Sequence, residues 1–528
     1  MRNILLIRFS SLGDVILTSA TVLNIKINFP DSHVVYLTKE TYGPIVEGFD
    51  GVDEIVTAAP SVTAAEYARL LLKLRKREFD AVIDLHGNWR AWLARNFVTA
   101  RTKCVYPKRR LERVRLVRQH RIPKSWPHTI DLYNQCIERL GGRIVCKRAV
   151  IRRLNTSGIP EDVAELMSGR PTVVIAPGAA HPNKQWPIDR FVDVAKRLHQ
   201  SNGAVIIWAV TAVDATRASL THVIPQEYFA ELVDCPVGVL ASIIALADVT
   251  LANDSGIAHL SSAVGTPVVA VFGPTHPALG FAPRGVFDRV VEVEEPCRPC
   301  SLHGRKPCYR EERFCFNRIG SETVGEAVAD KLEMSRKSGR ALFVDRDGTI
   351  IKDKVFLADA DGIEFEPRAI EALRRAQGLG FKIVVLSNQS GVARGLFGIE
   401  TVERINERFG SLLSAQGVQV DGIYYCPHLP GGSVPEYAKS CDCRKPAAGM
   451  VEQAARRLEI KLHRSYVVGD KIDDVNLGRV IGGYSFLVRS GKGKEQEQQL
   501  RESGISHRVE VCDDLGSAVK RIEALEQS

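Results

Sequence analysis

The stretch ALFVDRDGT, residues 341–349, decides the fold of the last part of this 528-residue chain. Its apolar start predicts a strand, and Asp345 and Asp347 follow at the carboxyl end of that strand. Alternate residues of a strand share a face, so both carboxylates point the same way at the edge where open α/β sheets bind ligands. One carboxylate can attack phosphorus, and the other can protonate the leaving oxygen and then activate water. An ordinary surface turn rich in aspartate is the alternative explanation.

Three later segments favour the chemical explanation. An apolar strand at 381–386 ends in SNQSG, residues 387–391, whose hydroxyl and backbone N–H groups suit a phosphate. Arg444 and Lys445 supply cations for the same anion. A strand at 466–468 leads into GDK, residues 469–471, and Asp473 and Asp474 follow. The carboxylate of Asp470 is a ligand for Mg²⁺, which offsets the repulsion between a phosphoryl group and a nucleophilic carboxylate.

A second metal is indicated between these segments. Cys426 and His428 are followed after twelve residues by Cys441 and Cys443. Three thiolates and one imidazole in two close pairs suit tetrahedral Zn²⁺. Cysteines that only fill a core are the alternative, but the Gly-Gly-Ser at 431–433 makes a poor core segment. A zinc-pinned loop directly before Arg444 would position the cations, so its role is structural.

These elements, in this order, resemble the haloacid dehalogenase (HAD) superfamily and, with the zinc loop, its D-glycero-D-manno-heptose-1,7-bisphosphate 7-phosphatases. The resemblance covers 340–528. It implies Asp345 as nucleophile, Asp347 as general acid and base, and Mg²⁺ on Asp345, Asp470 and the backbone carbonyl of Asp347. The expected substrate-binding residues are Ser387, Asn388, Gln389, Arg444, Lys445 and Lys471. Histidinol-phosphate phosphatases share much of the pattern and remain an alternative.

The first part of the chain carries weaker signals. SSLGD, residues 10–14, follows an apolar strand and opens a helix, so its N–H groups can meet an anion and Asp14 can act as a base. A capped turn explains the same residues equally well. Farther on, APGA at 176–179 precedes Lys184, and NDSGIAH at 253–259 places Ser255 and Gly256 at a helix N-terminus. Such a terminus suits a phosphate, although an ordinary capped helix with His259 in the core is the alternative.

The three motifs together resemble glycosyltransferase family 9, the ADP-heptose:lipopolysaccharide heptosyltransferases, over residues 1–330. The resemblance implies a GT-B architecture, Asp14 as the base that deprotonates the acceptor, and ADP-heptose as donor. The implied donor-binding residues are Lys184, Asp254, Ser255, Gly256 and His259. No metal is required, because lysine and helix N–H groups can stabilise the leaving diphosphate. The turn VTAVD, 210–214, lacks the family's usual Gly-rich form, so the nucleotide preference stays open.

Strands and helices alternate throughout, which predicts an α/β protein of three Rossmann-like units. We expect an acceptor-binding domain at 1–155, a nucleotide-sugar-binding domain at 156–333, a polar linker at 334–340 and a HAD-like domain with a zinc loop at 341–528. Single predicted elements include strands at 3–9, 33–38, 79–85, 172–176, 204–209 and 267–272, and helices at 15–29 and 188–199.

Composition restricts the class and the location. A hydrophobic content of 45% with 25% charged residues excludes wholesale disorder. No apolar run approaches the roughly 20 residues of a membrane span, and the N-terminus lacks the pattern of a signal peptide. We therefore expect a cytoplasmic protein whose 12 cysteines are thiols or metal ligands. Whether Cys297, Cys300, Cys308 and Cys315 bind a metal is left open, as is the oligomeric state.

The net charge of +9 has a local origin. Residues 101–124 hold ten Lys and Arg against the single acid Glu112. A solvated helix face is the ordinary explanation for such a run. The sharper hypothesis is contact with a lipopolysaccharide core or with the anionic inner face of the cytoplasmic membrane. No recognition motif supports nucleic acid as a partner.

The pattern as a whole predicts a bifunctional enzyme of inner-core heptose metabolism. One part would transfer heptose from ADP-heptose to the lipopolysaccharide core, and the other would hydrolyse the 7-phosphate of heptose 1,7-bisphosphate through an aspartyl-phosphate. The alternative joins a phosphatase to a GT-B module that is noncatalytic or has another specificity. The acceptor position and the anomer that the phosphatase prefers are not predicted.

Overall fold

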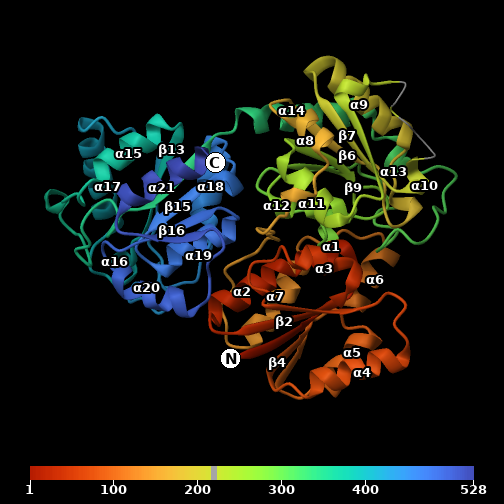
Figure 1. Ribbon diagram of the computed structural model, residues 1–528, viewed down its shortest axis with the longest axis horizontal. Helices are drawn as coiled ribbons and strands as arrows, with labels where there is room; N and C mark the ends of the chain where they lie inside the picture. The colour runs from red at the N-terminus through yellow and green to blue at the C-terminus, as the bar shows by residue number, and fades with distance from the viewer. Residues whose placement is uncertain (216–219, 221–222, 528) are drawn as a thin grey trace. The chain divides into compact units, whose positions relative to one another are not determined.

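The computed structural model describes residues 1–215, 220 and 223–527, without the side chains of residues 214 and 215. Two compact units divide the chain, Met1–Arg336 and Lys337–Ser528. In the described part of the chain, the strands form three parallel sheets, two in the first unit and one in the second (Figure 1). This arrangement confirms the α/β class and the three Rossmann-like sheets predicted from the sequence.

The first half of unit Met1–Arg336 is built on the sheet β3-β2-β1-β4-β5. The central strands β1, β2 and β4 are largely buried, as expected of a parallel sheet that helices cover, whereas the edge strands β3 and β5 are partly exposed. The strands are β1 (Asn3–Ile7), β2 (His33–Lys39), β3 (Glu54–Ala58), β4 (Phe79–Asp84) and β5 (Ala100–Val105). The helices are α1 (Leu12–Leu17), α2 (Ser19–Asn28), α3 (Gly43–Val46), α4 (Ala64–Arg75), α5 (Trp89–Phe97), α6 (Arg110–Arg118) and α7 (Thr129–Arg139).

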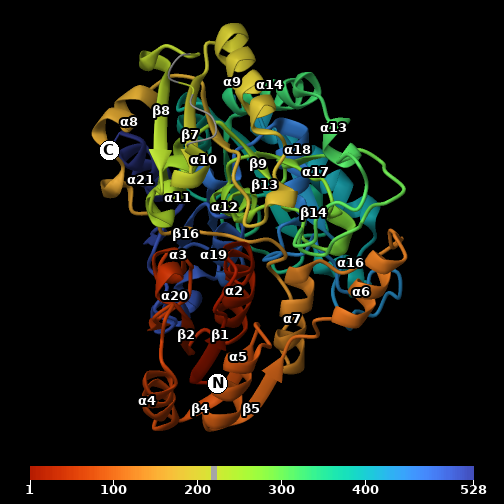
Figure 2. The ribbon, with the colours of Figure 1, turned by 90° about the vertical axis from the view of Figure 1, so that its right-hand side faces the viewer.

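The second half of this unit is built on the sheet β11-β10-β9-β6-β7-β8. Its strands are β6 (Thr172–Ala176), β7 (Val205–Val210), β8 (Phe229–Val233), β9 (Val249–Asn253), β10 (Val268–Val271) and β11 (Arg289–Val291). Its helices are α8 (Glu161–Met167), α9 (Ile188–Asn202), α10 (Ala212–Ala215), α11 (Val237–Leu246), α12 (Gly256–Val264), α13 (Phe314–Asn317) and α14 (Ser321–Lys337). Helices α1 and α12 meet where the two halves face each other (Figures 1 and 2).

Unit Lys337–Ser528 is built on the sheet β14-β13-β12-β15-β16-β17. The strands are β12 (Arg340–Asp345), β13 (Phe381–Asn388), β14 (Gly422–Cys426), β15 (Tyr466–Gly469), β16 (Tyr484–Val488) and β17 (Val509–Cys512). The helices are α15 (Ala369–Gly378), α16 (Ser390–Ala393), α17 (Ile399–Ala415), α18 (Gly449–Leu458), α19 (Ile472–Ile481), α20 (Gly493–Glu502) and α21 (Leu515–Gln527). Strands β12, β13 and β15 are central, so the motifs that follow them converge at one edge.

Two local expectations differ from the structure. The single helix expected at 15–29 is two helices, α1 and α2, which join at Thr18. The Thr18 hydroxyl is 2.6 Å from the carbonyl of Val15 and 2.7 Å from the hydroxyl of Tyr36, which ties the junction to β2. The stretch 334–340, expected as a linker, begins as the last turn of α14 and ends at the first residue of β12. Among the described residues, no helix is long and apolar enough to cross a membrane.

Candidate active sites

Asp345 lies at the carboxyl end of β12, in the middle of its sheet. Its side chain is 4% exposed, and its register partner is Leu386 of β13, so Ser387 follows directly beside it. Burial would raise the pKa of Asp345, but Lys445 and Lys471 outweigh burial and hold that pKa below its usual value. The carboxylate is therefore ionised at neutral pH, which is the form that a nucleophile requires.

Asp347 is held by donors from several elements. Its Oδ2 accepts hydrogen bonds from Ser387 Oγ at 3.0 Å and from Gln389 Nε2 at 2.9 Å. The guanidinium of Arg346 donates to both of its oxygens and also to Asn406 Oδ1, at 2.7 Å. Ser387 and Gln389 were expected to bind the substrate phosphate, and the structure places both side chains against the carboxylate of Asp347. No role was predicted for Arg346, because its position between the two aspartates does not reveal from the sequence that its side chain binds Asp347.

Lys445 lies against the nucleophile. Its ammonium is hydrogen-bonded to Asp345 Oδ1, lies 2.6 Å from Asp474 Oδ1 and donates to the carbonyl of Leu386 at 3.1 Å. Asn388 brackets the backbone of Lys445, accepting from its N–H at 3.0 Å and donating to its carbonyl at 3.2 Å. Asn388, expected to bind substrate, thus positions this lysine. Asp474 was only noted as a neighbour of the GDK motif, and the structure makes it the lysine's second carboxylate.

The carboxylates of Asp345, Asp470 and Asp474 each place an oxygen within 4.8 Å of the others. Within the described residues, Asp345 Oδ2 and Asp470 Oδ1 are buried and accept no hydrogen bond, although Lys471 Nζ lies 3.9 Å and 3.2 Å from them. Burial, followed by the charge of Asp345, raises the pKa of Asp470 to about 7. Two buried carboxylate oxygens that accept no hydrogen bond and lie this close together are suitable ligands for a hard divalent cation, so these residues fit Mg²⁺.

Gly348 makes room for this cluster. Its φ is +92°, a conformation that favours glycine, and a Cβ there would lie 2.4 Å from Asp470 Oδ2. The carbonyl of Gly348 accepts a hydrogen bond from Ser490 Oγ at 2.7 Å. The turn after Asp347 is therefore packed directly onto the carboxylate at the end of β15.

The four expected zinc ligands converge. The Sγ atoms of Cys426, Cys441 and Cys443 lie 3.1–3.5 Å from one another, and His428 Nδ1 lies 3.3 Å from Cys443 Sγ. With Zn–S bonds of about 2.3 Å, thiolates on one tetrahedral zinc lie about 3.8 Å apart, so a small expansion of the cluster would accommodate the ion. Arg444 donates to the carbonyl of His428 at 3.1 Å, which connects the cluster to the cations that follow it.

A cleft of about 1380 Å³ separates the two halves of unit Met1–Arg336. All six transferase residues expected from the sequence line it, and they come from both halves: Asp14, Lys184, Asp254, Ser255, Gly256 and His259. The cleft is also lined by His86, Tyr106 and Lys108 of the first half and by Thr275 and Lys306 of the second.

Asp14 lies in the first turn of α1 at the floor of this cleft. Arg8 Nη2 is 2.6 Å from its Oδ2, Ser11 Oγ donates to Oδ2 at 2.9 Å, and the Tyr133 hydroxyl donates to Oδ1 at 3.1 Å. Burial would raise the pKa of Asp14, but Arg8 and these hydrogen bonds lower it. The carboxylate is therefore ionised and able to accept a proton. Arg8 and Tyr133 were missed, because an arginine just after a strand and a tyrosine 119 residues from Asp14 form no motif.

The second half presents a cation and unpaired polar atoms. Lys184 Nζ lies 2.7 Å from Asp254 Oδ2, which also accepts from Thr275 Oγ1 at 2.6 Å. Within the described residues, Ser255 Oγ and His259 Nδ1 are buried and have no hydrogen-bond partner. Burial lowers the pKa of His259 and outweighs the nearby carboxylates, so the ring is neutral. Unpaired atoms at the N-terminus of α12 suit a bound phosphate or hydroxyl group.

Gly256 serves a packing role that the motif did not reveal. A Cβ at Gly256 would lie 2.9–3.0 Å from Leu12, and one at Gly13 would lie 2.7 Å from His259. The two glycines therefore let α1 and α12 approach closely, so that Asp14 and the start of α12 reach the same cleft. The side chain of Asp214, in the turn with the unusual sequence, lies outside the described residues.

The basic segment 101–124 divides into two groups. Arg101 and Lys103 lie exposed on β5, whereas four basic residues of the segment line the cleft: Lys108, Arg110, Arg113 and Arg118. Arg113 is buried, and its guanidinium lies 4.7 Å from the ring centre of Phe281 across the cleft. A solvated helix face therefore does not account for the whole run.

The second cysteine cluster does not converge like the first. Among the described residues, three or more possible metal ligands lie within 4.8 Å of one another at two places, the expected zinc site and the three aspartates of the phosphatase site. The thiols of Cys297, Cys300, Cys308 and Cys315 belong to neither group. Cys300 and Cys308 instead contact backbone carbonyls, of Pro274 and Glu312, at 3.7 Å.

Comparisons with known proteins find relatives for both parts of the chain. Residues 67–307 match the model of glycosyltransferase family 9 (heptosyltransferase), and residues 442–518 match the HAD-hydrolase-like model. The D-glycero-beta-D-manno-heptose-1,7-bisphosphate 7-phosphatase of Yersinia pestis is 39% identical over 181 residues, which are 34% of this chain and 95% of the relative.

Two solved structures represent the two parts. The D,D-heptose 1,7-bisphosphate phosphatase of B. bronchiseptica, complexed with magnesium and phosphate, is 30% identical, with 36% of this chain and 99% of that one covered and a TM-score of 0.32. The ADP-heptose lipopolysaccharide heptosyltransferase II of E. coli is 20% identical, with 64% of this chain and 100% of that one covered and a TM-score of 0.49.

Proposed function

We propose that this one polypeptide performs two reactions of lipopolysaccharide heptose metabolism. The chain belongs to the D-glycero-beta-D-manno-heptose-1,7-bisphosphate 7-phosphatases, and a glycosyltransferase family 9 domain precedes its phosphatase domain. The phosphatase would release the 7-phosphate of heptose 1,7-bisphosphate. The transferase would move heptose from ADP-heptose to the lipopolysaccharide core. The observation that carries the proposal is the ionised, buried Asp345 beside Lys445 in a chain that covers 95% of such a phosphatase.

In the phosphatase, a carboxylate oxygen of Asp345 attacks phosphorus, and the bond from phosphorus to the sugar oxygen breaks. Asp347 gives its proton to that leaving oxygen. Water then attacks the aspartyl-phosphate while Asp347 takes a proton from it, and phosphate and free Asp345 result. Lys445, Lys471 and Arg444 bind the anionic group, and Asn388 keeps Lys445 in place. Asp345, Asp470 and the backbone carbonyl of Asp347 would hold Mg²⁺, which would supply positive charge to neutralise the phosphoryl group.

In the transferase, the acceptor hydroxyl oxygen attacks the anomeric carbon of the donor, and the bond to the diphosphate oxygen breaks. Asp14 accepts the hydroxyl proton, and ADP leaves. Lys184 and the N-terminus of α12, with Ser255, stabilise the negative charge that develops on the diphosphate. Lys108, Arg110, Arg113 and Arg118 line the cleft and suit anionic groups of a core acceptor. Peripheral contact with the anionic inner face of the cytoplasmic membrane, and hence a cytoplasmic location, belong to the same proposal.

Paired substitutions test the two assignments. Asp345→Asn should lower phosphate release from heptose 1,7-bisphosphate by about 1000-fold or more and leave heptosyl transfer unchanged, because it removes the nucleophile alone. Asp14→Asn should have the reverse effect. Comparable phosphate release by wild type and Asp345→Asn would refute the nucleophile. Faster phosphate release from histidinol phosphate than from the heptose bisphosphate would favour the alternative phosphatase. Protein that binds the core acceptor but leaves ADP-heptose unconsumed would favour a noncatalytic GT-B module.

A further inference from the structure

Helix α5 exposes an unusual face. Trp89, Trp92, Leu93 and Phe97 are 64%, 54%, 36% and 37% exposed, and their spacing places them on one side of the helix. On the opposite side, Ala91 and Ala94 are buried in the core that also contains Leu5 and Tyr67. The large aromatic side chains therefore face outward while alanines face the sheet, the reverse of what an ordinary surface helix shows. A contiguous exposed apolar face of this kind marks an interaction site.

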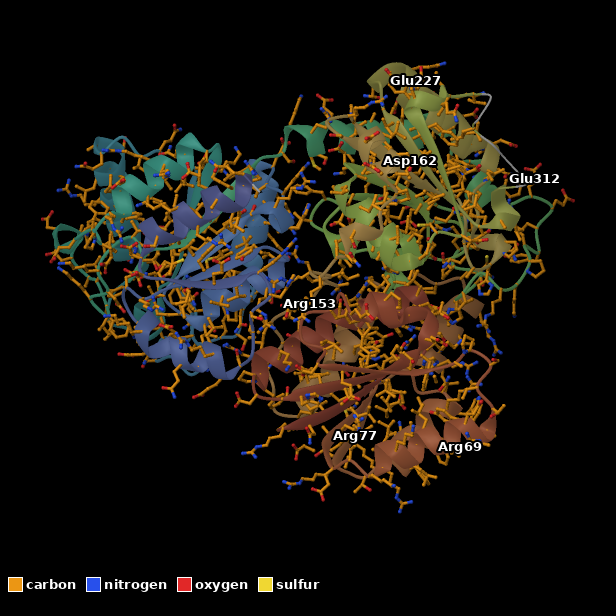
Figure 3. All side chains as sticks on the ribbon, in the orientation of Figure 1. Arg69, Arg77, Arg153, Asp162, Glu227 and Glu312 are labelled. Atoms are coloured by element: carbon orange, nitrogen blue, oxygen red, sulfur yellow. The ribbon has the colours of Figure 1, made fainter. Side chains whose placement is uncertain are left out.

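Two arginines lie against this α5 face. The guanidinium of Arg90 lies 5.4 Å from the ring centre of Trp89, and that of Arg75 lies 5.0 Å from the ring centre of Phe97. Residues 64–103, which form α4, β4, α5 and the start of β5, contain nine Lys and Arg against four Asp and Glu. Arg69 projects from α4 in the same half (Figure 3). Tryptophan bordered by arginine and lysine is the combination found where proteins lie in a lipid headgroup layer.

The α5 face is directly connected to the cleft. His86, two residues before the N-cap of α5, lines the cleft, and the carbonyl of Gly87 accepts a hydrogen bond from Lys108 of the cleft at 2.9 Å. Asn88 begins the helix by accepting from the N–H of Ala91 at 2.8 Å. A surface in contact with α5 would therefore lie next to the acceptor side of the cleft.

We propose that the α5 face docks this protein on an anionic lipid bilayer, with its aromatic rings at the headgroup level and the neighbouring cations on lipid phosphates. The proposal deepens the proposed function, on which it rests, since a lipid-linked acceptor would then meet the cleft at the membrane surface. A second copy of the chain is the less suitable occupant. A symmetric pair through α5 would bring the same cations of both copies together, whereas anionic headgroups neutralise them.

The test uses the full chain with sedimented vesicles of phosphatidylcholine, with or without 30% phosphatidylglycerol. The wild type should bind the anionic vesicles, lose binding at high salt and shift its tryptophan emission to shorter wavelength. The triple variant Trp89→Ser, Trp92→Ser, Phe97→Ser should bind roughly tenfold more weakly, because it removes most of the apolar area of the face. Leu396→Ser in the other unit is the matched control, since Leu396 is 54% exposed, as is Trp92, and should change nothing.

Transfer of heptose to a water-soluble, delipidated core fragment separates docking from catalysis and from misfolding. The triple variant should retain this transfer and its phosphatase activity while losing vesicle binding. Wild-type protein that stays in the supernatant with anionic vesicles, or a triple variant that binds like wild type, would overturn the docking proposal. A wild-type dimer that the triple variant abolishes, without vesicle binding, would assign the face to a second copy. If the wild type bound vesicles through the α5 face but transferred no heptose, the docking proposal would stand and only the transferase assignment would be wrong.

Discussion

At the scale of single residues, Lys445 determines the charge state of the phosphatase site. Burial would lower the pKa of its ammonium, but Asp345 and Asp474 outweigh burial and raise that pKa, so the lysine stays charged inside the protein. The same pairing keeps Asp345 ionised. An approaching phosphoryl group would therefore meet a nucleophile and a cation that already sit in contact, which removes the need to reorganise charge during the reaction.

The first prediction concerns Asn388, which holds the backbone of Lys445 through two hydrogen bonds. Asn388→Ala should lower kcat/KM for the bisphosphate by about tenfold, since the lost positioning corresponds to roughly 1–2 kcal/mol. Phosphate-release kinetics measure the effect, and an unfolding curve checks the fold. Gln416→Ala removes an exposed amide of the same unit and should behave like wild type. Unchanged kinetics for Asn388→Ala would show that Lys445 needs no such support.

The second prediction concerns pH and His86. Burial, then Arg8 and Lys108, lower the pKa of His86 to about 3, and its Nδ1 accepts a hydrogen bond from the N–H of Phe9 at 3.1 Å. Between pH 6.5 and 3 the unfolded chain takes up a proton here that the folded chain does not, so stability is complete above pH 6.5 and falls as the pH decreases. His86→Asn retains an acceptor and should flatten this fall, by at most about 1.4 kcal/mol per pH unit.

Calorimetric Tm values of the first unit from pH 4.5 to 7.5 would measure this effect. Wild-type protein scanned over the same pH range serves as the comparison. A His86→Asn variant with the same slope as wild type would mean that protonated His86 is accommodated in the folded cleft.

The sequence predicted the residues that form motifs and missed those that approach them through the fold. Asp345 and Asp347 could be identified because a strand delivers both to one face. Tyr133 and Asp474 could not, because only the folded chain brings Tyr133 to Asp14 and Asp474 to Lys445. Asn388 was expected to bind substrate, but an amide beside a phosphate site can also contact the backbone, and in the fold it pairs with the backbone of Lys445.

At the scale of elements, the loop between β14 and α18 connects a metal cluster to catalysis. Cys426 ends β14, and Cys443 lies two residues before Lys445. A bound zinc would fix both ends of this loop, because four ligands close it at one point. Arg444 and Lys445 would then enter the site from a rigid segment.

The third prediction follows from this loop. The purified chain should contain about one zinc ion, and Cys441→Ser should lose it, lower the Tm of the phosphatase unit and reduce phosphate release with Mg²⁺ in excess. Metal analysis, calorimetry and kinetics measure the three effects. Cys512→Ser alters a half-buried thiol of the same unit outside the cluster and should retain the zinc. Zinc-free wild type with full activity would contradict the prediction.

The fourth prediction concerns the contact between α1 and α12. Gly13→Ala places a methyl group 2.7 Å from the ring of His259, so one helix must shift. Overpacking of this kind costs about 1–3 kcal/mol, and we expect a lower Tm of the first unit with a higher KM for ADP-heptose. Gly378→Ala, where a methyl group meets nothing within 4 Å, is the control. Unchanged donor kinetics in Gly13→Ala would show that the close helix contact does not shape the donor site.

Element boundaries illustrate where sequence patterns are insufficient. The apolar spacing of 15–29 fits one helix, yet the chain turns at Thr18, whose hydroxyl lies within hydrogen-bonding distance of Val15 and Tyr36. That turn depends on β2, a neighbour that a local pattern does not contain. The strands that the sequence predicted, such as β1, β6 and β12, are short apolar runs and almost wholly buried, whereas the edge strands β3 and β5 are partly exposed and were not predicted.

At the scale of the whole molecule, the distribution of charge distinguishes the two activities. The basic segment 101–124 belongs entirely to the transferase unit, and four of its cations line the cleft. Interactions of exposed charges weaken as salt rises, whereas Lys445 and Asp345 of the phosphatase form a buried ion pair that salt screens less. Salt should therefore affect the two activities differently within one chain.

The fifth prediction tests this difference. Arg110→Gln with Arg118→Gln removes two cations of the cleft and leaves the buried Arg113 in place, so the KM for an anionic core acceptor should rise about tenfold at low salt. The kcat/KM for the bisphosphate should not change. Arg404→Gln with Arg457→Gln, at exposed positions of the phosphatase unit, is the control of equal charge and should alter neither activity. If the cleft variant kept the wild-type acceptor KM and salt dependence, these cations would serve only solubility, and acceptor recognition would depend on neutral contacts around Asp14.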